Sequence, residues 1–388
     1  MIRALYLHVP YCERKCAYCD FTSVGGVRGQ REYAAALQAE LRGMAERLPA
    51  DAVALDTVFV GGGTPSLIDA ALLGGILDTV RACFTVRPGA EVTMEANPSS
   101  TTPRKADAWL EAGVNRISLG VQSLHGDVLD FLDRVHDATR ALQAVRDVQA
   151  AGFVRVNTDL IYAVPGLDDA RWRDTLDRVL ALGCEHLSCY ELTVEEGTPL
   201  ASAVQAGAVP TVDADTALRQ HWITVDAAQR AGLRQYEISN FARPGAECRH
   251  NLAYWHNDFY LAAGVGAHGH LPPQAAERLG IAPPGGAQDC TAAVRYWHTD
   301  AIADYVAGAP LGAEAVTAAQ RAQESILVGL RLVTEGVALP DDARTAHEAN
   351  ALRDAGLLTV DGRVARVTAR GQELLDAVAL RLCDARAA

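Results

Sequence analysis

The sequence predicts an α/β protein, a full or partial β/α barrel followed by a small α+β module. Three observations predict this fold. Short apolar segments alternate with amphipathic stretches from residue 5 to residue 239, a polar residue stands near the end of most apolar segments, and after residue 317 the pattern changes to helices around one hairpin. Alternating strands and helices are typical of βαβ units, and barrel sites gather at the carboxyl ends of the strands.

The predicted elements follow one another regularly. We expect strands at 5–9, 57–60, 91–95, 116–119, 154–161 and 186–191, with a seventh at 235–239. The helices expected between them are 31–47, 67–83, 103–112, 138–151 and 170–182, each ending near Gly or Pro. This order is that of the repeating unit of a β/α barrel.

The C-terminal part has a different pattern. The Pro/Gly-rich stretch 271–288 is predicted as a loop. From Thr317 we expect two helices, a hairpin around Asp361-Gly362 and a last helix, which resembles a winged helix. The expected parts are a barrel domain 1–270, a loop and linker region 271–316, and a C-terminal domain 317–388. The acidic to neutral character of the C-terminal domain favours a substrate lid or docking unit over a DNA-binding unit.

Composition places the chain among globular proteins. Of its 388 residues 49% are hydrophobic and 21% are charged, and the formal net charge is -13. The sequence has no long Lys/Arg cluster, so we expect no nucleic-acid partner. No apolar run reaches the ~18 residues of a spanning helix, and the N-terminus lacks the features of a secretory signal. We therefore expect a cytoplasmic protein that is not integral to a membrane.

Three of the nine cysteines follow the first expected strand with the spacing Cys12-x3-Cys16-x2-Cys19. The others are scattered, which does not fit a disulfide framework. A loop of this size places three thiolates around three corners of an iron-sulfur cubane and leaves one iron open to another ligand. A structural zinc site would need a fourth ligand, for which His8 is the local candidate. The cluster is the favoured hypothesis, with zinc or unrelated cysteines as the alternatives.

A glycine-rich turn, Gly61-Gly62-Gly63-Thr64-Pro65, follows the second expected strand. By itself it predicts only a tight turn from strand to helix. Because it faces the same rim as the cysteines, we expect its exposed backbone to pair with the amino group and carboxylate of a bound methionine moiety. Glycine permits that close approach.

Four polar residues stand at or just beyond later strand ends: Glu95, Gln122, Arg134 and Asp159. Each of them, taken singly, is equally explained as a cap or an ion-pair partner. Together they are expected to line one mouth of the barrel. Arg134 has a planar fork suited to a carboxylate, and Gln122 and Asp159 are the right types for ribose hydroxyls.

These motifs resemble a known family, the radical S-adenosylmethionine (SAM) proteins similar to oxygen-independent coproporphyrinogen III oxidase, and within it the haem chaperones of the HemW type. An aromatic residue between the last two cysteines is common in radical SAM loops, and Tyr18 stands there. The shared segments keep the family's order and spacing over most of the chain: LYLHVPYC at 5–12, GGGTPS at 61–66, GVQS at 120–123, residues 157–165, YELT at 190–193 and GTP at 197–199.

The resemblance implies a radical SAM barrel with a 4Fe-4S cluster on the three cysteines and SAM at its open iron. The implied SAM contacts are Tyr6, Tyr18, Gly62, Gly63, Thr64, Glu95, Gln122, Arg134 and Asp159, with a late contact near Ala267 and His268. It also implies reductive cleavage of SAM to methionine and a 5′-deoxyadenosyl radical, which requires an electron donor.

Two features separate the chain from the oxidases that it resembles. Those oxidases carry a further cysteine two residues after the third cluster ligand and a longer N-terminal arm. Here Cys19 is followed by Asp20 and Phe21, and the first strand begins at residue 4 or 5. The string HNLAYW at 250–255 is similar to the signature of HemW-type proteins.

His250 has two interpretations. Without the resemblance it is a hydrogen-bonded packing residue, and with it His250 is a candidate haem ligand, with Tyr254 and Trp255 as a flat apolar wall. Other candidate ligands are Cys248, His256, His268 and His270.

We therefore expect a haem chaperone that holds a SAM-ligated 4Fe-4S cluster, binds haem and delivers it to an acceptor protein, membrane-associated or respiratory. The alternative is an oxygen-independent coproporphyrinogen III oxidase that converts propionates to vinyl groups, so whether the chain is an enzyme stays open at this point. A third hypothesis is a different radical SAM activity on another substrate.

Overall fold

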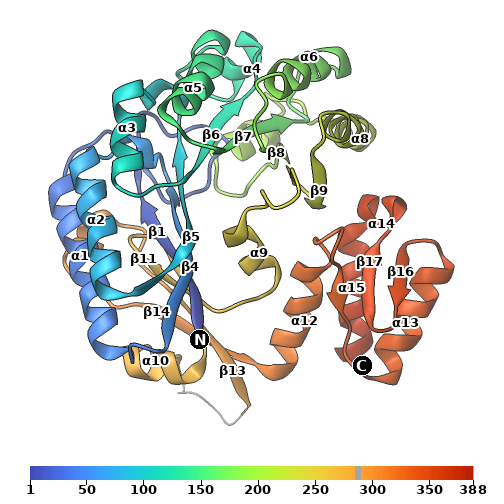
Figure 1. The fold of residues 1–388 in the computed structure, drawn as a ribbon. Helices are drawn as coiled ribbons and strands as arrows, with labels where there is room; N and C mark the ends of the chain where they lie inside the picture. The colour runs from blue at the N-terminus through green and yellow to red at the C-terminus, as the bar shows by residue number, and fades with distance from the viewer. Residues whose placement is uncertain (285–289, 388) are drawn as a thin grey trace.

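The computed structural model describes residues 1–284 and 290–387, and over these residues a twelve-stranded mixed sheet forms the frame of the molecule (Figure 1). The strand order is β14-β13-β12-β11-β1-β4-β5-β6-β7-β8-β10-β9. All pairings from β11 to β8 are parallel, and the remaining ones are antiparallel. The strands are β1 (Ile2–Val9), β4 (Val53–Gly62), β5 (Thr85–Ala96), β6 (Arg116–Gln122), β7 (Arg155–Tyr162), β8 (His186–Glu191), β9 (Arg234–Glu237), β10 (Asn240–Ala242), β11 (Tyr260–Ala263), β12 (His268–Leu271), β13 (Thr291–Trp297) and β14 (Gly312–Thr317).

Each parallel strand is near-continuously apolar because both of its faces are covered. β6 is buried at every residue except its last, Gln122. Helices lie along the outer face of the sheet in Figure 1. They are α1 (Gln30–Arg47), α2 (Ala70–Cys83), α3 (Pro103–Glu111), α5 (Ala138–Ala151), α6 (Asp169–Leu180) and α8 (Ala214–Arg230). Two short helices, α4 (Gly126–Phe131) and α7 (Pro199–Gln205), follow β6 and β8.

The helix expected at 67–83 begins later than predicted. A short 3-10 turn, η1 (Pro65–Leu67), comes first, and α2 starts at Ala70. The Asp69 side chain accepts a hydrogen bond from the Ala71 backbone N–H, so this N-cap sets the start of the helix.

The sheet is a partial barrel over the described residues. Successive strands from β4 to β8 add side by side, as in a β/α barrel, but no pairing among the described residues joins β9 to β14, the two ends of the sheet. Helix α9 (Arg249–Trp255) lies against the inner, concave side, where it contacts β4 (Figure 1).

The loop and linker prediction for 271–316 needs correction. This stretch contains α10 (Pro273–Leu279), β13, α11 (Ile302–Val306) and β14, so the sheet continues to Thr317. The reason is tertiary: β13 and β14 extend the sheet beyond β12, and the buried Tyr296 hydroxyl donates to the Ala262 carbonyl oxygen. Residues 285–288 of the predicted loop lie outside the described residues.

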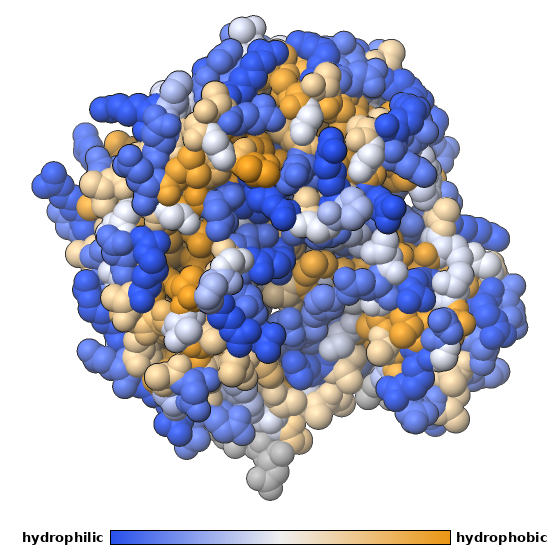
Figure 2. Space-filling model, viewed as in Figure 1, coloured by the Kyte–Doolittle hydropathy of each residue, from blue (hydrophilic) through white to orange (hydrophobic). Residues whose placement is uncertain are grey.

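The C-terminal unit contains the predicted helices and hairpin. It comprises α12 (Ala318–Gly329), β15 (Val337–Ala338), α13 (Ala343–Asp354), β16 (Leu358–Asp361), β17 (Val364–Val367), α14 (Ala369–Glu373) and α15 (Leu375–Ala387). The hairpin turns at Asp361-Gly362, and β15 adds a third strand that the sequence analysis missed. A separate apolar cluster, with Leu330, Leu352 and Leu382 fully buried, forms its core. Figure 2 shows hydrophilic side chains over much of its outer surface.

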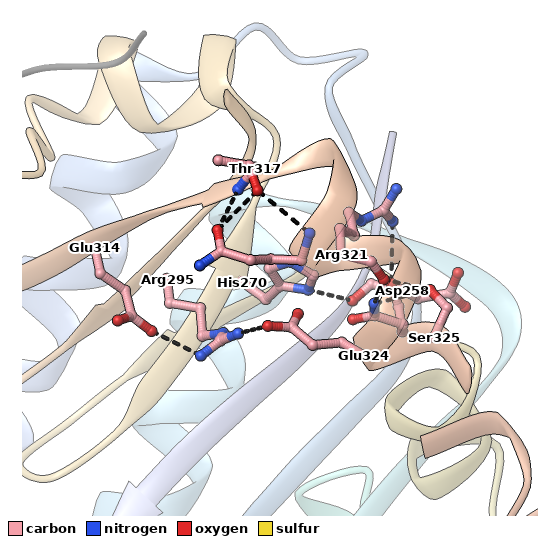
Figure 3. Close-up of polar contacts among 10 residues, drawn as sticks. Asp258, His270, Arg295, Glu314, Thr317, Arg321, Glu324 and Ser325 are labelled. Atoms are coloured by element: carbon pink, nitrogen blue, oxygen red, sulfur yellow. Dashed lines mark hydrogen bonds and ion pairs between the residues drawn. The ribbon is translucent and has the colours of Figure 1, made fainter. Parts of the chain in front are cut away.

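Polar contacts attach α12 to the edge of the sheet (Figure 3). Arg295 on β13 forms ion pairs with Glu314 on β14 and Glu324 on α12. The guanidinium of Arg321 lies 4.4 Å from the centre of the Phe259 ring. Charged and cation–π contacts therefore hold the barrel and the C-terminal unit together, and Ile238, between β9 and β10, adds an apolar contact with the C-terminal core. Among the described residues, no helix has both the length and the apolarity needed to cross a bilayer.

Candidate functional site

The three clustered cysteines lie on one loop at the carboxyl end of β1. Pro10 leads into β2 (Tyr11–Cys12), which pairs with β3 (Val24–Gly25) and closes the loop between them. The N–H of Gly26 donates to the Cys12 carbonyl at 2.7 Å. Burial raises the pKa of the Cys19 thiol, and the neighbouring thiols of Cys16 and Cys12 raise it further. The cysteines are thus close enough to interact.

A clasp formed by Asp133 and Arg134, between α4 and α5, holds the middle of this loop. The Asp133 carboxylate accepts from the Ala17 N–H at 3.0 Å and pairs with Arg14 at 3.7 Å. Arg134 Nη1 lies 3.8 Å from Cys16 Sγ, and its Nη2 donates to Asn97 Oδ1 at 2.5 Å. Asp133 has a φ of 54°, a left-handed conformation in which Asp is among the tolerated residues.

The glycine-rich turn presses directly on the cysteine loop. A Cβ on Gly63 would lie 2.8 Å from the Pro10 carbonyl carbon, so only glycine fits there. The N–H groups of Gly62, Gly63 and Thr64 donate to Glu95 Oε2, the Val9 carbonyl and the Tyr11 carbonyl.

These three amides are therefore engaged within the protein, and the expected pairing of the turn's backbone with a methionine moiety would have to use its carbonyl oxygens. The turn's clearest effect is to place the Thr64 hydroxyl 3.6 Å from Cys12 Sγ.

Two acidic side chains lie on the inner face of the sheet. Burial, together with the nearby Asp159, raises the pKa of Glu95 to about 8. Burial also raises the pKa of Asp159, although its oxygens accept from Ser118 Oγ and Asn157 Nδ2, both at 2.8 Å. The site therefore contains a carboxyl group, Glu95, that is largely protonated at neutral pH in the absence of a ligand.

Gln122 and Tyr18 complete the set of predicted side chains on this rim. Gln122 ends β6 with a φ of 64°, at an irregularity in the pairing with β7. Burial raises the pKa of the Tyr18 hydroxyl to about 12, and the neighbouring Arg134 opposes this shift.

These residues line one cavity of about 360 Å³ at the carboxyl ends of the strands. The predicted residues among its walls are Cys12, Cys16, Cys19, Tyr18, Gly62, Gly63, Thr64, Glu95, Gln122, Arg134 and Asp159. Such a mouth, with a few polar groups converging on an apolar wall, is the usual form of a small-molecule site.

Three other predicted contacts lie outside the cavity walls. Tyr6 stands behind them, with its hydroxyl 3.1 Å from His8 Nδ1 and its ring stacked on Phe59. The Ala267 carbonyl accepts from His298 Nδ1 at 2.9 Å. His268 begins β12 and stacks on Trp297.

The structure favours the packing interpretation of His250 over the haem-ligand one. His250 is 1% exposed, and its two ring nitrogens lie 2.8 Å from Thr57 Oγ1 and 2.9 Å from Tyr254 Oη. The Glu91 carboxylate accepts from the N–H groups of Arg249 and His250 at the start of α9. With both ring nitrogens engaged, His250 offers no free lone pair to an iron, and it fastens α9 to the inner face of the sheet.

Sequence reasoning missed Asp133, Asn97 and Ser118. Asn97 follows Glu95 by two residues. Its Oδ1 accepts a hydrogen bond from Arg134 Nη2, and its Nδ2 donates one to Thr64 Oγ1 at 3.1 Å. The sequence did contain a signal for two of these three residues. Asp133 directly precedes Arg134, and Asn97 directly follows a strand end. Nothing in the sequence distinguishes Ser118 from any other buried strand residue.

The donor set fits a cubane cluster better than a single metal ion. Among the described residues no three His, Cys, Asp or Glu side chains converge as one ion requires. A 4Fe-4S cluster instead holds each thiolate at a separate corner, and the three thiols all line one cavity of about 360 Å³. His8 is not available as a fourth zinc ligand, because its ring nitrogens bond Tyr6 Oη and the Thr22 carbonyl.

The parallel partial barrel and its three-cysteine loop define the class of radical SAM domains. Residues 6–179 match the family model of the radical SAM superfamily. The fold resembles that of the solved Escherichia coli coproporphyrinogen III oxidase, HemN, with a TM-score of 0.79 and 20% identity over 98% of this chain and 90% of that one. At that identity, the likeness shows the fold alone.

Similarity to curated proteins narrows the class of radical SAM protein to which this chain belongs. The chain is 39% identical to the Heme chaperone HemW of Mycobacterium tuberculosis over 386 residues, covering 96% of this chain and 93% of that protein. It is 36% identical to the Heme chaperone HemW of Escherichia coli, over 69% of this chain and 70% of that one. The chain belongs to the HemW family of radical SAM proteins. That family implies SAM and a 4Fe-4S cluster as cofactors.

Proposed function

We propose that this protein is a haem chaperone that carries a 4Fe-4S cluster on Cys12, Cys16 and Cys19, binds SAM in the adjoining cavity, and transfers haem to an acceptor protein. The observation that carries the proposal is the near full-length similarity to a protein named Heme chaperone HemW. The proposal requires two protein partners, an electron donor and a haem acceptor that is membrane-associated or respiratory.

The cavity supplies suitable groups for SAM. The Arg134 guanidinium provides a fork for a carboxylate, and Gln122 and Asp159 provide acceptors for ribose hydroxyls. Glu95 keeps a proton until a cationic group approaches and favours its ionised form. When bound, the cluster would supply the electron for SAM cleavage, while the protein orients the nucleoside and excludes water.

Phe21 argues for a carrier over an oxidase. It is 60% exposed and lines the cavity, at the position where the oxidases resembled by the sequence carry a further cysteine. An exposed aromatic ring beside the site suits an apolar, flat cargo.

Metal reconstitution tests the cluster assignment. Anaerobic addition of iron and sulfide to the wild type should yield about four irons per chain and a broad charge-transfer absorption. Replacing Cys12, Cys16 or Cys19 with Ala should abolish both signals. Cys83→Ala is the matched control, because Cys83 ends α2 outside the cavity, and it should retain them. Retention of the full cluster in all three cavity variants would refute the assignment.

Haem titration and an oxidase assay on the same reconstituted sample test the function. A chaperone binds one haem per chain and releases no product from coproporphyrinogen III with SAM and a reductant. Formation of more than one equivalent of product would favour the oxidase function. The one structural argument for that function is the cavity, which would serve either activity.

A further inference from the structure

The histidines of this protein differ sharply in whether a ring nitrogen remains free for a metal. The chain has 11 histidines. Both ring nitrogens are engaged in His8, His186, His250 and His298. His125 and His256 bind a carbonyl or a carboxylate, and His136, His221 and His270 are buried or half-buried. Within the described residues, His268 and His347 alone are exposed without a hydrogen bond to the ring.

His268 and His347 have different surroundings. No aromatic ring lies against His347, which projects from α13. His268 stands opposite Trp297 in the β12–β13 pairing, with ring centres 6.2 Å apart and an interplanar angle of 21°. Figure 3 shows that His270, two residues further along β12, is instead held by the Asp258 carbonyl under α12.

The indole that stacks on His268 is itself held in place. Trp297 is opposite Gly312 on β14, where a Cβ would lie 2.3 Å from the indole. Glycine at this position allows the indole to lie flat on the β14 backbone. The 37% exposed Trp297 is therefore a fixed support and not a mobile surface side chain.

His268 lies beside the cluster loop. Gly266, two residues before it, packs so tightly against Thr22 that a Cβ would approach Thr22 Oγ1 to 2.4 Å. The Thr22 hydroxyl also donates to Asp300 at 2.5 Å. Thr22 directly follows Phe21, the exposed aromatic residue of the cavity wall. A ligand on His268 would thus lie next to the loop that carries the cysteines.

We propose that His268 is the axial protein ligand of the haem iron, with Trp297 as the residue that orients its imidazole. The proposal rests on the proposed chaperone function and adds the site of the cargo. The plane of an axial imidazole is perpendicular to the porphyrin plane. An indole that is parallel to the imidazole therefore orients the imidazole without covering the porphyrin face. The apolar surface that we assign to the macrocycle is Phe21, which directly precedes Thr22 on the cluster loop.

Haem titration of matched variants tests this site. His268→Ala should lower haem affinity about tenfold or more and shift the Soret band, whereas the matched His347→Ala, also an exposed histidine without a ring hydrogen bond, should behave as wild type. His268→Gly should regain the wild-type Soret band on addition of free imidazole. Trp297→Ala should keep haem bound but change the spin state seen by electron paramagnetic resonance, which a merely structural residue would not do.

The outcomes separate the two proposals. If the wild type binds no haem, the chaperone proposal fails and the ligand assignment fails with it. If the wild type binds haem and His268→Ala has the wild-type affinity and spectrum, only the assignment of His268 is overturned. Thermal unfolding of each variant excludes loss of the fold, which is not expected for an exposed side chain.

Discussion

At the scale of single residues, the chemistry of the site depends on groups whose protonation the fold alters. Glu95 is the clearest case, because burial and then Asp159 raise its pKa from 4.5 to about 8. The folded apo protein therefore holds a proton on Glu95 over a pH range in which the unfolded chain has released it. A cationic ligand group would favour its release.

The raised pKa of Glu95 predicts how stability depends on pH. The stabilisation linked to this proton is fully present below pH 4.5 and is lost as the pH rises through about 8. Glu95→Gln should remove this loss, so that its free energy of unfolding falls less than that of the wild type between about pH 5 and pH 8, by about 1 kcal/mol or more. Thermal unfolding across this range measures the difference. Glu195→Gln, an exposed carboxylate on the same cavity, is the control, and an equal effect there would contradict the prediction.

At the scale of elements, two contacts between segments distant in the sequence organise the site. The clasp formed by Asp133 and Arg134 connects the α4–α5 segment to the cysteine loop. The Thr64 hydroxyl connects the turn after β4 to Cys12. On the inner face, Glu91 and Thr57 hold α9 through His250. Each of these contacts holds a loop or a helix in place. The local sequence of that loop or helix would not hold it there by itself.

The clasp predicts that Asp133 stabilises the cluster without ligating it. Asp133→Ala leaves the Ala17 N–H and Arg14 without their carboxylate, so the reconstituted cluster should be lost in air about tenfold faster than in the wild type. The decay of the cluster absorption measures this rate. Asp130→Ala, which removes an exposed carboxylate of α4, should decay as the wild type does. Equal rates for all three proteins would exclude a positioning role.

The engaged ring of His250 predicts a structural effect. Tyr254→Phe removes the hydroxyl that bonds His250 Nε2 and should lower the free energy of unfolding by about 1 kcal/mol, with the haem Soret band unchanged. Chemical denaturation and a haem titration measure the two effects. A variant with native stability and an altered Soret band would instead point to the haem-ligand interpretation of this region.

At the scale of the whole molecule, two apolar cores lie side by side. The larger core belongs to the sheet and its helices, and the smaller one belongs to the C-terminal unit. Charged and aromatic contacts connect them, such as Arg295 with Glu324 and Arg321 with Phe259 (Figure 3). The two units are therefore expected to respond separately to core mutations.

A core substitution in the C-terminal unit tests that independence. Leu352 is 0% exposed, and Leu352→Ala should destabilise the C-terminal unit by about 2–5 kcal/mol through lost burial and a cavity. Calorimetry should show an early transition for this unit while the barrel transition and the cluster yield stay unchanged. Leu374→Ala, at a 47% exposed site, serves as the control. A shift of the whole transition would show that the two cores unfold together.

The sequence by itself determined the six parallel strands from β1 to β8, five of the helices that cover them, and 11 of the residues that line the cavity. These follow from local causes: apolar periodicity, the Cys12-x3-Cys16-x2-Cys19 spacing, and polar residues at strand ends, which parallel strands bring to one rim. All of the predicted side chains from Tyr18 to Asp159 line the same cavity.

Only the tertiary structure decided the rest, because long-range pairing and burial leave no local mark in the sequence. β13 and β14 form strands because a sheet edge was available to pair with them, although the prediction placed 271–316 in a loop and linker region. His250 and His268 are alike as isolated residues. The fold encloses His250 between Thr57 and Tyr254 and leaves the ring of His268 exposed on Trp297, and that difference in burial and bonding separates a packing residue from a proposed ligand.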